Sequence, residues 1–467
     1  MRGLGPAPKP QFRVTKFSAN PARTLRERPD CADKAYQNKA LPVLAMGLRG
    51  RSCIRGRLTE FFSMMQKTKT LCMLATCVLL AAGPVSAQLS APREPAPLTF
   101  GPVSVHPILQ ILDAGVDENV FNDGSDPERD YTMTIATRIL TVLRMGSNEL
   151  LFQAGNDYVW FQQFDSERSS NAQYAMRFNL SASRFKPYIG AEHIHTSARR
   201  TPEIDARARR VDRSVLGGLG FDLTPRTSLT ASARLDDVSY DEGETFRGVP
   251  LDDALNRSGR AGEAGVRYAL TPLTTLAVTA GYEQQTFVQS HVRDLKRYTV
   301  GPALEFSPEA AIRGRVAAAF EMFKPDDASL AERKGIAYQA TVNWTLYDRT
   351  NFDLGAGRNI TYSYQDTEPY YQLTNIRLLV SHPLPVRFEL YGGGDLQWMA
   401  YRWRHGAALA DSTRVDDLAA VNGGVGIRFS RSVHVRVGIE KTRRRSVVDP
   451  IQNYTRTRIM STVSVGS

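Results

Sequence analysis

The chain has 467 residues, of which 42% are hydrophobic and 23% charged, so it is too apolar for a disordered chain and long enough for a large folded body. Fifteen of the 59 Lys and Arg and four of the 48 Asp and Glu precede residue 88, so the net charge of +11 belongs to the N-terminal part and 44 residues of each sign follow it. This balance argues against a nucleic-acid partner. All four cysteines also precede residue 88, and a cysteine-free remainder suits an oxidising compartment.

Residues 64–87 have the pattern of a secretory signal peptide. A short positive stretch, residues 64–69, precedes apolar residues 71–82, and Val85 and Ala87 supply small side chains before a cleavage site after Ala87. The apolar stretch falls short of the roughly 20 residues that a spanning helix needs. We therefore expect export from the cytoplasm by the general secretory route.

Two segments without periodic pattern flank this signal. Residues 1–63 carry scattered Arg and Pro, and are interpreted as a start codon assigned too early or as a disordered extension. Residues 88–102 are rich in proline and are expected to form a periplasmic lead. The folded body is then predicted over 103–467.

The body shows strand-like alternation in place of long amphipathic helices. In residues 387–398 one face carries Phe, Leu, Leu and Trp while the other carries mainly polar side chains, and residues 434–440 repeat the design. The predicted strands often reach about 12 to 16 residues, against a globular mode of about 5–6, and a tilted membrane strand needs roughly 9–11 within the hydrocarbon. The length of the strands therefore favours a membrane barrel over a soluble propeller of similar repeat length.

Short and long connections alternate along the body. Eight short turns are predicted near residues 145–147, 185–187, 224–226, 271–273, 307–309, 347–349, 383–385 and 430–432. Nine mostly longer loops are predicted near residues 117–129, 164–169, 199–210, 241–256, 288–292, 324–333, 365–369, 402–414 and 443–452. The predicted fold is an all-β, transmembrane, antiparallel up-and-down β-barrel of about 18 strands (16–18), with both termini on the short-turn side.

The first predicted strand ends in a short motif that resembles a known family. Residues 114–121, Ala-Gly-Val-Asp-Glu-Asn-Val-Phe, are similar to the opening of the putative β-barrel porin family, whose members include porin-like proteins and outer-membrane proteins of exopolysaccharide operons. The resemblance implies a Gram-negative outer-membrane barrel that the barrel-assembly machinery inserts. The chain departs from outer-membrane barrels at its end, because it closes on Ser464-Val465-Gly466-Ser467 where an aromatic residue is usual.

Charged residues recur on the polar faces of the predicted strands and are candidates to line a water-filled lumen. Their arginine excess favours a mild anion preference, although pairing of Arg with Glu across strands as inert struts explains the same pattern. The candidates are Arg177, Arg234, Asp236, Glu263, Arg267, Arg313, Arg315, Arg377, Arg387, Glu389, Asp395, Arg428, Arg436, Glu440, Arg456 and Arg458.

Two basic clusters stand at predicted loop edges. Such clusters could bind lipopolysaccharide phosphates, and a solvated loop is the plainer interpretation of each. The candidate residues are Arg199, Arg200, Arg209, Arg210, Arg443, Arg444 and Arg445.

Signals for metal binding and catalysis are weak. His193 and His195 share one strand face, as two metal ligands would, but no third ligand is apparent from the sequence. No serine, histidine and carboxylate can be matched by spacing into a catalytic set. We expect no metal, no cofactor and no enzyme activity.

These patterns together predict a porin-like outer-membrane channel for passive diffusion of small solutes through a charged lumen, narrowed by an infolded loop such as 241–256. The alternatives are an outer-membrane component of exopolysaccharide export and, less favoured, a barrel-type outer-membrane hydrolase. Expected partners are outer-membrane lipid and lipopolysaccharide, the assembly machinery, and small solutes or polysaccharide, with no nucleic acid. The solute, the oligomeric state and the open or plugged condition of the lumen are left open.

Overall fold

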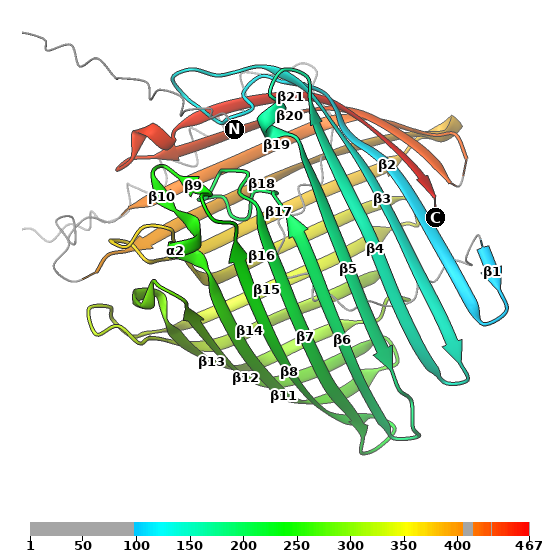
Figure 1. The fold of residues 1–467 in the computed structure, drawn as a ribbon. Coiled ribbons are helices and arrows are strands. Elements are labelled where there is room, and N and C mark those ends of the chain that lie inside the picture. The colour runs from blue at the N-terminus through cyan, green and yellow to red at the C-terminus, as the bar shows by residue number, and fades with distance from the viewer. Residues whose placement is uncertain (1–97, 405–413, 431, 467) are drawn as a thin grey trace, which may run out of the picture. The chain divides into compact units, whose positions relative to one another are not determined.

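Eighteen long antiparallel strands close into a barrel in the computed structural model, which describes residues 98–404, 414–430 and 432–466 (Figure 1). The segments 1–63 and 64–87, with the predicted cleavage site at Ala87, lie outside the described residues. Each strand pairs with its sequence neighbours, and the strands run from 11 to 16 residues. The fold and the strand number predicted from the sequence are thus confirmed.

The barrel strands are β2 (Val103–Asp117), β3 (Asp130–Met145), β4 (Asn148–Phe161), β5 (Ser169–Asn179), β6 (Phe185–Thr196), β7 (Arg210–Asp222), β8 (Thr227–Tyr240), β11 (Arg257–Thr271), β12 (Thr274–Phe287), β13 (Leu295–Phe306), β14 (Ile312–Pro325), β15 (Arg333–Leu346), β16 (Thr350–Tyr362), β17 (Tyr370–Pro383), β18 (Phe388–Arg402), β19 (Val415–Arg428), β20 (Val433–Ser446) and β21 (Tyr454–Gly466). Short β1 (Leu98–Phe100) pairs with β2 at the turn end.

Helices are short and belong to the connections. They are α2 (Leu251–Leu255) and the 3-10 turns η1 (Asp165–Glu167), η2 (His291–Arg293), η3 (Pro385–Arg387) and η4 (Pro450–Gln452). The strands β9 (Thr245–Phe246) and β10 (Val249–Pro250) form a small hairpin just before α2. No helix in the described part of the chain is long and apolar enough to cross a membrane.

The barrel closes where β2 pairs with β21, and we call this junction the seam. The close approach of the two strands there requires glycine at position 115. A Cβ built at Gly115 would lie 1.9 Å from the carbonyl oxygen of Ile459, so a side chain there would push the strands apart. The pairing of β2 is irregular between Ile111 and Ala114, and Asp113 has a positive φ of 53°. An extra residue at this point bends the strand locally, which suits the place where the sheet joins itself.

Each strand presents an apolar outer face and a polar inner face, because successive side chains point to opposite sides. On β11, Val266 and Leu270 are each 47% exposed on the outside, while Arg267 lies between them on the inner face. The same alternation separates outward Leu235 from inward Arg234 on β8. The exposed apolar band is the surface expected of a barrel surrounded by hydrocarbon.

Two connections differ from the sequence prediction. The turn expected at 185–187 lies at 180–184, because Ala182 and Phe185 exchange backbone hydrogen bonds of 2.8 and 2.9 Å and Ser183 takes a positive φ. Pro187 stays within β6, where it forfeits one donor near the strand end. Residues 443–446 of the loop predicted at 443–452 belong to β20, which ends at Ser446.

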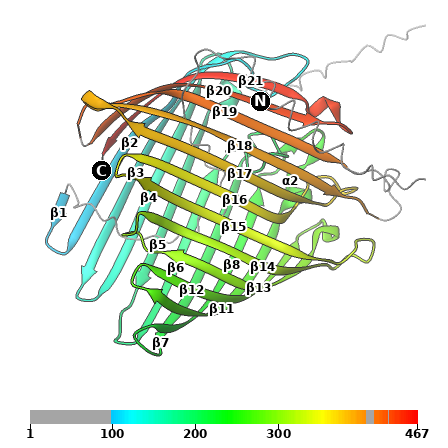
Figure 2. The ribbon, with the colours of Figure 1, turned by 180° about the vertical axis from the view of Figure 1, so that it is seen from behind.

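The long-loop end holds the buried core. Fourteen buried apolar side chains from β8, β12–β14, β16, β17, their loops and the β6–β7 loop form one cluster there, in which α2 contributes Leu251, Ala254 and Leu255. Figure 2 shows α2 from behind, at the loop end of the barrel. The end of the β16–β17 hairpin bends inward, since Tyr362 packs on Phe287 with ring centroids 5.5 Å apart. The barrel is therefore filled at one mouth.

Candidate functional site: the interior wall and the closed mouth

Fifteen of the sixteen predicted lumen residues lie on inward-facing positions of barrel strands. The exception is Arg387, which lies in η3 at the turn end with a positive φ of 75° and donates to the Phe429 carbonyl at 2.8 Å. Contact between the sixteen predicted residues and a solute stays a prediction.

Most of these charges are paired across strands. Arg377 lies 2.8 Å from Asp395, Arg436 lies 2.7 Å from Glu389, and Arg458 lies 2.5 Å from Glu440. Such pairs hold neighbouring strands in register and leave little net charge behind. Structural pairing of Arg with Asp or Glu across strands therefore accounts for many of the inward charges on the wall.

Some inward arginines have neutral partners instead. Arg177 donates to Asn179 at 2.8 Å and lies 4.0 Å from the centroid of the Tyr188 ring. Arg313 donates to Asn343 and Thr345. Among the described residues neither guanidinium has a carboxylate at ion-pair distance, so the wall is locally positive at Arg177 and Arg313.

Loop 197–209, between β6 and β7, crosses the mouth from one wall to the opposite one. Its Arg199 donates to the Val120 carbonyl at 2.6 Å on the side of β2. Arg444 of β20, which only β21 separates from β2, donates to the Pro202 carbonyl at 2.7 Å. Ser363, in the loop between β16 and β17, donates to Glu203 at 2.5 Å. This loop is the infolded one that spans the lumen, whereas loop 241–256 packs beside it in the apolar cluster.

A buried ionic network surrounds Arg444, which binds loop 197–209 at Pro202. Arg414 pairs with Glu368 at 2.7 Å and with Asp416 at 2.9 Å, and Arg444 pairs with Asp416 at 3.1 Å. All four side chains are at most 3% exposed. Because breaking a buried pair leaves an uncompensated charge, this network is costly to disrupt.

Glu203 lies at the centre of this mouth and is fully buried. Burial raises the pKa of Glu203 to about 7, while the hydrogen bond from Ser363 and the nearby guanidiniums of Arg414 and Arg444 oppose the rise. Burial likewise raises the pKa of Glu368 against the effect of Arg414. The closed mouth thus contains a carboxyl group that titrates near neutral pH.

The candidate lipopolysaccharide residues divide by face. Arg199, Arg200, Arg210 and Arg444 point inward and are engaged with carboxylates or carbonyls of the protein. Arg443 and Arg445 alternate with Arg444 on the outer face of β20, and Arg209 is exposed beside Glu244. The lipopolysaccharide hypothesis is therefore retained for Arg209, Arg443 and Arg445.

Outside the wall and the mouth, the weaker candidates do not gather into sites. His193 and His195 lie on the outward face of β6, where His193 neighbours the Tyr174 ring at a centroid distance of 6.5 Å. Among the described residues, no group of three or more His, Cys, Asp or Glu side chains could hold a metal ion. Sequence reasoning missed Glu203 and Glu368, and the available signal was the presence of apolar Ile204, Leu251 and Leu255 within otherwise polar loops.

Comparison with known proteins gives one family and several distant structures. The family model described as putative beta-barrel porin 2 matches residues 91–466. No curated protein matches the chain. Among solved structures, a BenF-like porin from Pseudomonas fluorescens Pf-5 is 11% identical over 79% of this chain and 100% of its own, with a TM-score of 0.43. OpdO from Pseudomonas aeruginosa is 12% identical over 78% of this chain and 97% of its own, with a TM-score of 0.43. Since the family model covers more than half of the sequence, the chain belongs to the putative beta-barrel porin 2 family and is a porin-like β-barrel of the bacterial outer membrane.

Proposed function

We propose that this barrel is a channel for passive diffusion of small solutes whose loop-side mouth opens when loop 197–209 moves. The observation that carries the proposal is the contrast between an apolar exterior and a charged interior wall. An eighteen-stranded barrel is too wide for wall side chains to fill, so its lumen needs either a plug or water.

Small inward residues below the mouth support a water-filled middle. Several strands on one arc of the barrel carry Gly or Ala at inward positions, so their walls project little into the lumen. These residues are Ala261, Gly265, Gly281, Gly301, Ala317, Ala319, Gly335 and Ala337. A barrel built as a solid scaffold would instead fill this space with large side chains.

The surplus of inward arginine supports an anion preference. In a confined lumen, uncompensated positive charge raises the local concentration of anions and repels cations. Reversal potentials across a salt gradient measure this directly. A preference for cations would contradict it.

Single-channel recording tests the channel itself. The protein is purified from the outer membranes of a Gram-negative host, checked for heat-modifiable gel migration, and inserted into planar bilayers. We expect discrete ohmic steps with intervals of closure. A heat-modifiable, folded barrel that never conducts would refute the proposal and turn attention to exopolysaccharide export.

A further inference from the structure

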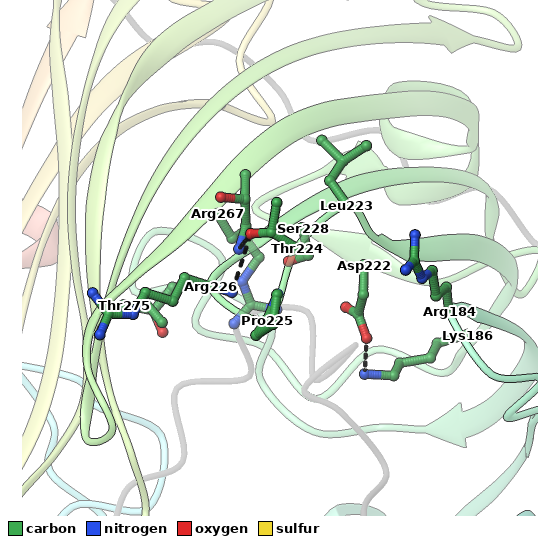
Figure 3. Close-up of a pocket in the computed structure, with 12 residues that line it drawn as sticks. Arg184, Lys186, Asp222, Leu223, Thr224, Pro225, Arg226, Ser228, Arg267 and Thr275 are labelled. Atoms are coloured by element: carbon green, nitrogen blue, oxygen red, sulfur yellow. Dashed lines mark hydrogen bonds and ion pairs between the residues drawn. The ribbon is translucent and has the colours of Figure 1, made fainter.

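A cavity of about 540 Å³ opens on the inner wall at the turn end, far from the loop-side mouth. Its lining comes from the β5–β6 and β7–β8 turns and from the adjoining ends of β6, β7, β8, β11 and β12. Figure 3 shows Thr224 and Pro225 of the β7–β8 turn between Arg184 and Lys186 on one side and Thr275, beside Arg226 of the same turn, on the other. The volume is within the usual range for small-molecule pockets.

The lining is strongly basic. Four of its side chains are cationic, Arg184, Lys186, Arg226 and Arg267, and one is a carboxylate, Asp222. Asp222 pairs with Lys186 at 2.6 Å, and Arg267 is occupied by Glu305 across the strands.

Within the described part of the chain, Arg184 and Arg226 have no carboxylate in ion-pair contact. Each of the other two cations has one. The pocket therefore holds two uncompensated guanidiniums.

Backbone hydrogen bonds fix the positions of these two arginines. The Arg184 carbonyl accepts from the Asp222 N–H at 2.9 Å, and the Arg226 carbonyl accepts from the Ala269 N–H at 2.8 Å. The β7–β8 turn is closed by reciprocal backbone bonds between Thr224 and Thr227. The backbone at both arginines is thus tied to the neighbouring strand, so only their side chains lose conformational freedom when they bind a ligand.

We propose that this pocket binds the carboxylate or phosphate group of a small anionic solute at the turn-side mouth. Guanidinium donors match both oxyanions in a bidentate geometry, and the hydroxyls of Thr227, Ser228 and Thr275 in the lining add donors for the rest of the ligand. The claim that this ligand is a transported solute rests on the proposed channel function. The claim that the pocket binds an oxyanion does not depend on that function.

Equilibrium calorimetry on the detergent-purified protein tests the pocket, with inorganic phosphate and succinate as separate probes. The variant is Arg184→Gln with Arg226→Gln. Arg349→Gln is the matched control, since Arg349 lies exposed in another turn at the same end and outside the pocket lining. Heat-modifiable migration establishes that each variant is folded.

We expect saturable binding of at least one probe, weakened at least about tenfold in the double variant and unchanged in the control, because charge-assisted hydrogen bonds are lost. Binding of phosphate alone indicates a phosphate ligand, and binding of both probes indicates a general oxyanion site. Absence of saturable binding, or equal affinity in the folded double variant and the control, overturns the proposal. A barrel that binds the probe but does not conduct would refute the channel function and leave the pocket standing.

Discussion

Replacing Arg444 with methionine tests whether loop 197–209 closes the mouth. Arg444 is 2% exposed and makes three contacts: an ion pair with Asp416 on neighbouring β19, a hydrogen bond to Gln452 in the connection after β20, and a hydrogen bond to the Pro202 carbonyl in the loop. The ion pair joins two wall strands, so it persists when the loop leaves. The hydrogen bond to Pro202 exists only in the closed arrangement.

The ion pair with Asp416 and the hydrogen bond to Pro202 therefore have separate consequences. Asp416 keeps its ion pair with Arg414 when Arg444 is lost, so the free energy of unfolding falls by less than the about 3–5 kcal/mol that an uncompensated buried charge costs. Losing the charged hydrogen bond to Pro202 removes about 1.5–3 kcal/mol from the closed arrangement, which shifts the closed-to-open ratio roughly 10- to 150-fold toward open. Arg444→Met should lower the temperature of heat-modifiable unfolding and also raise the open probability.

Single-channel open probability is the deciding measurement. Arg443→Met is the matched control, because Arg443 precedes Arg444 on β20 but points outward and is exposed. We expect the control to keep the open probability of the natural protein. If folded Arg444→Met opens no more often than Arg443→Met, loop 197–209 is not the closure of this mouth.

Three further outcomes are expected. Burial raises the pKa of Glu203 from 4.5 to about 7, so the closed mouth is most stable below about pH 4.5 and loses stability as the pH rises through 7. Open probability should rise over that interval, and Glu203→Gln should abolish the pH dependence; a flat profile in the natural protein would count against it. Gly115→Ala should reduce the yield of heat-modifiable barrel, while Gly335→Ala, with nothing within 4 Å of its Cβ position, should not, and equal yields would refute the seam argument. Arg443→Gln with Arg445→Gln should weaken lipopolysaccharide retention on purification, an expectation that unchanged retention would exclude.

The side of the barrel wall on which each strand side chain lies could be predicted from the sequence, because neighbouring residues of a strand point to opposite faces. A period of two assigns Arg234 and Asp236 to the face opposite Leu235, and the structure places them so. The prediction failed where a strand boundary was misplaced. Residues 443–445 were assigned to a loop, so Arg443 and Arg444 were given the same role although the strand places them on opposite faces.

The closed mouth could not be predicted, because it depends on contacts between distant segments. Pro202 and Arg444 are 242 residues apart, and Glu203 and Ser363 are 160 apart. No spacing rule connects such positions, since these segments become neighbours only through the three-dimensional fold. Apolar Leu251 and Leu255 in a loop indicate burial against something, but not which partner.

The charged residues at the loop end of the barrel are buried, whereas those at the turn end are exposed to water. We therefore expect closure of the channel and its ion selectivity to depend on different residues. At the loop end the ionic network is buried, so its contacts change in strength with protonation and with any rearrangement of loop 197–209. At the turn end Arg184 and Arg226 are exposed on short turns, and a rearrangement of loop 197–209 at the other end does not change their surroundings. A change at one end should therefore leave the property of the other end intact. We expect Arg444→Met to change how often the channel opens but not its ion selectivity, and Arg184→Gln with Arg226→Gln to change selectivity but not the open probability.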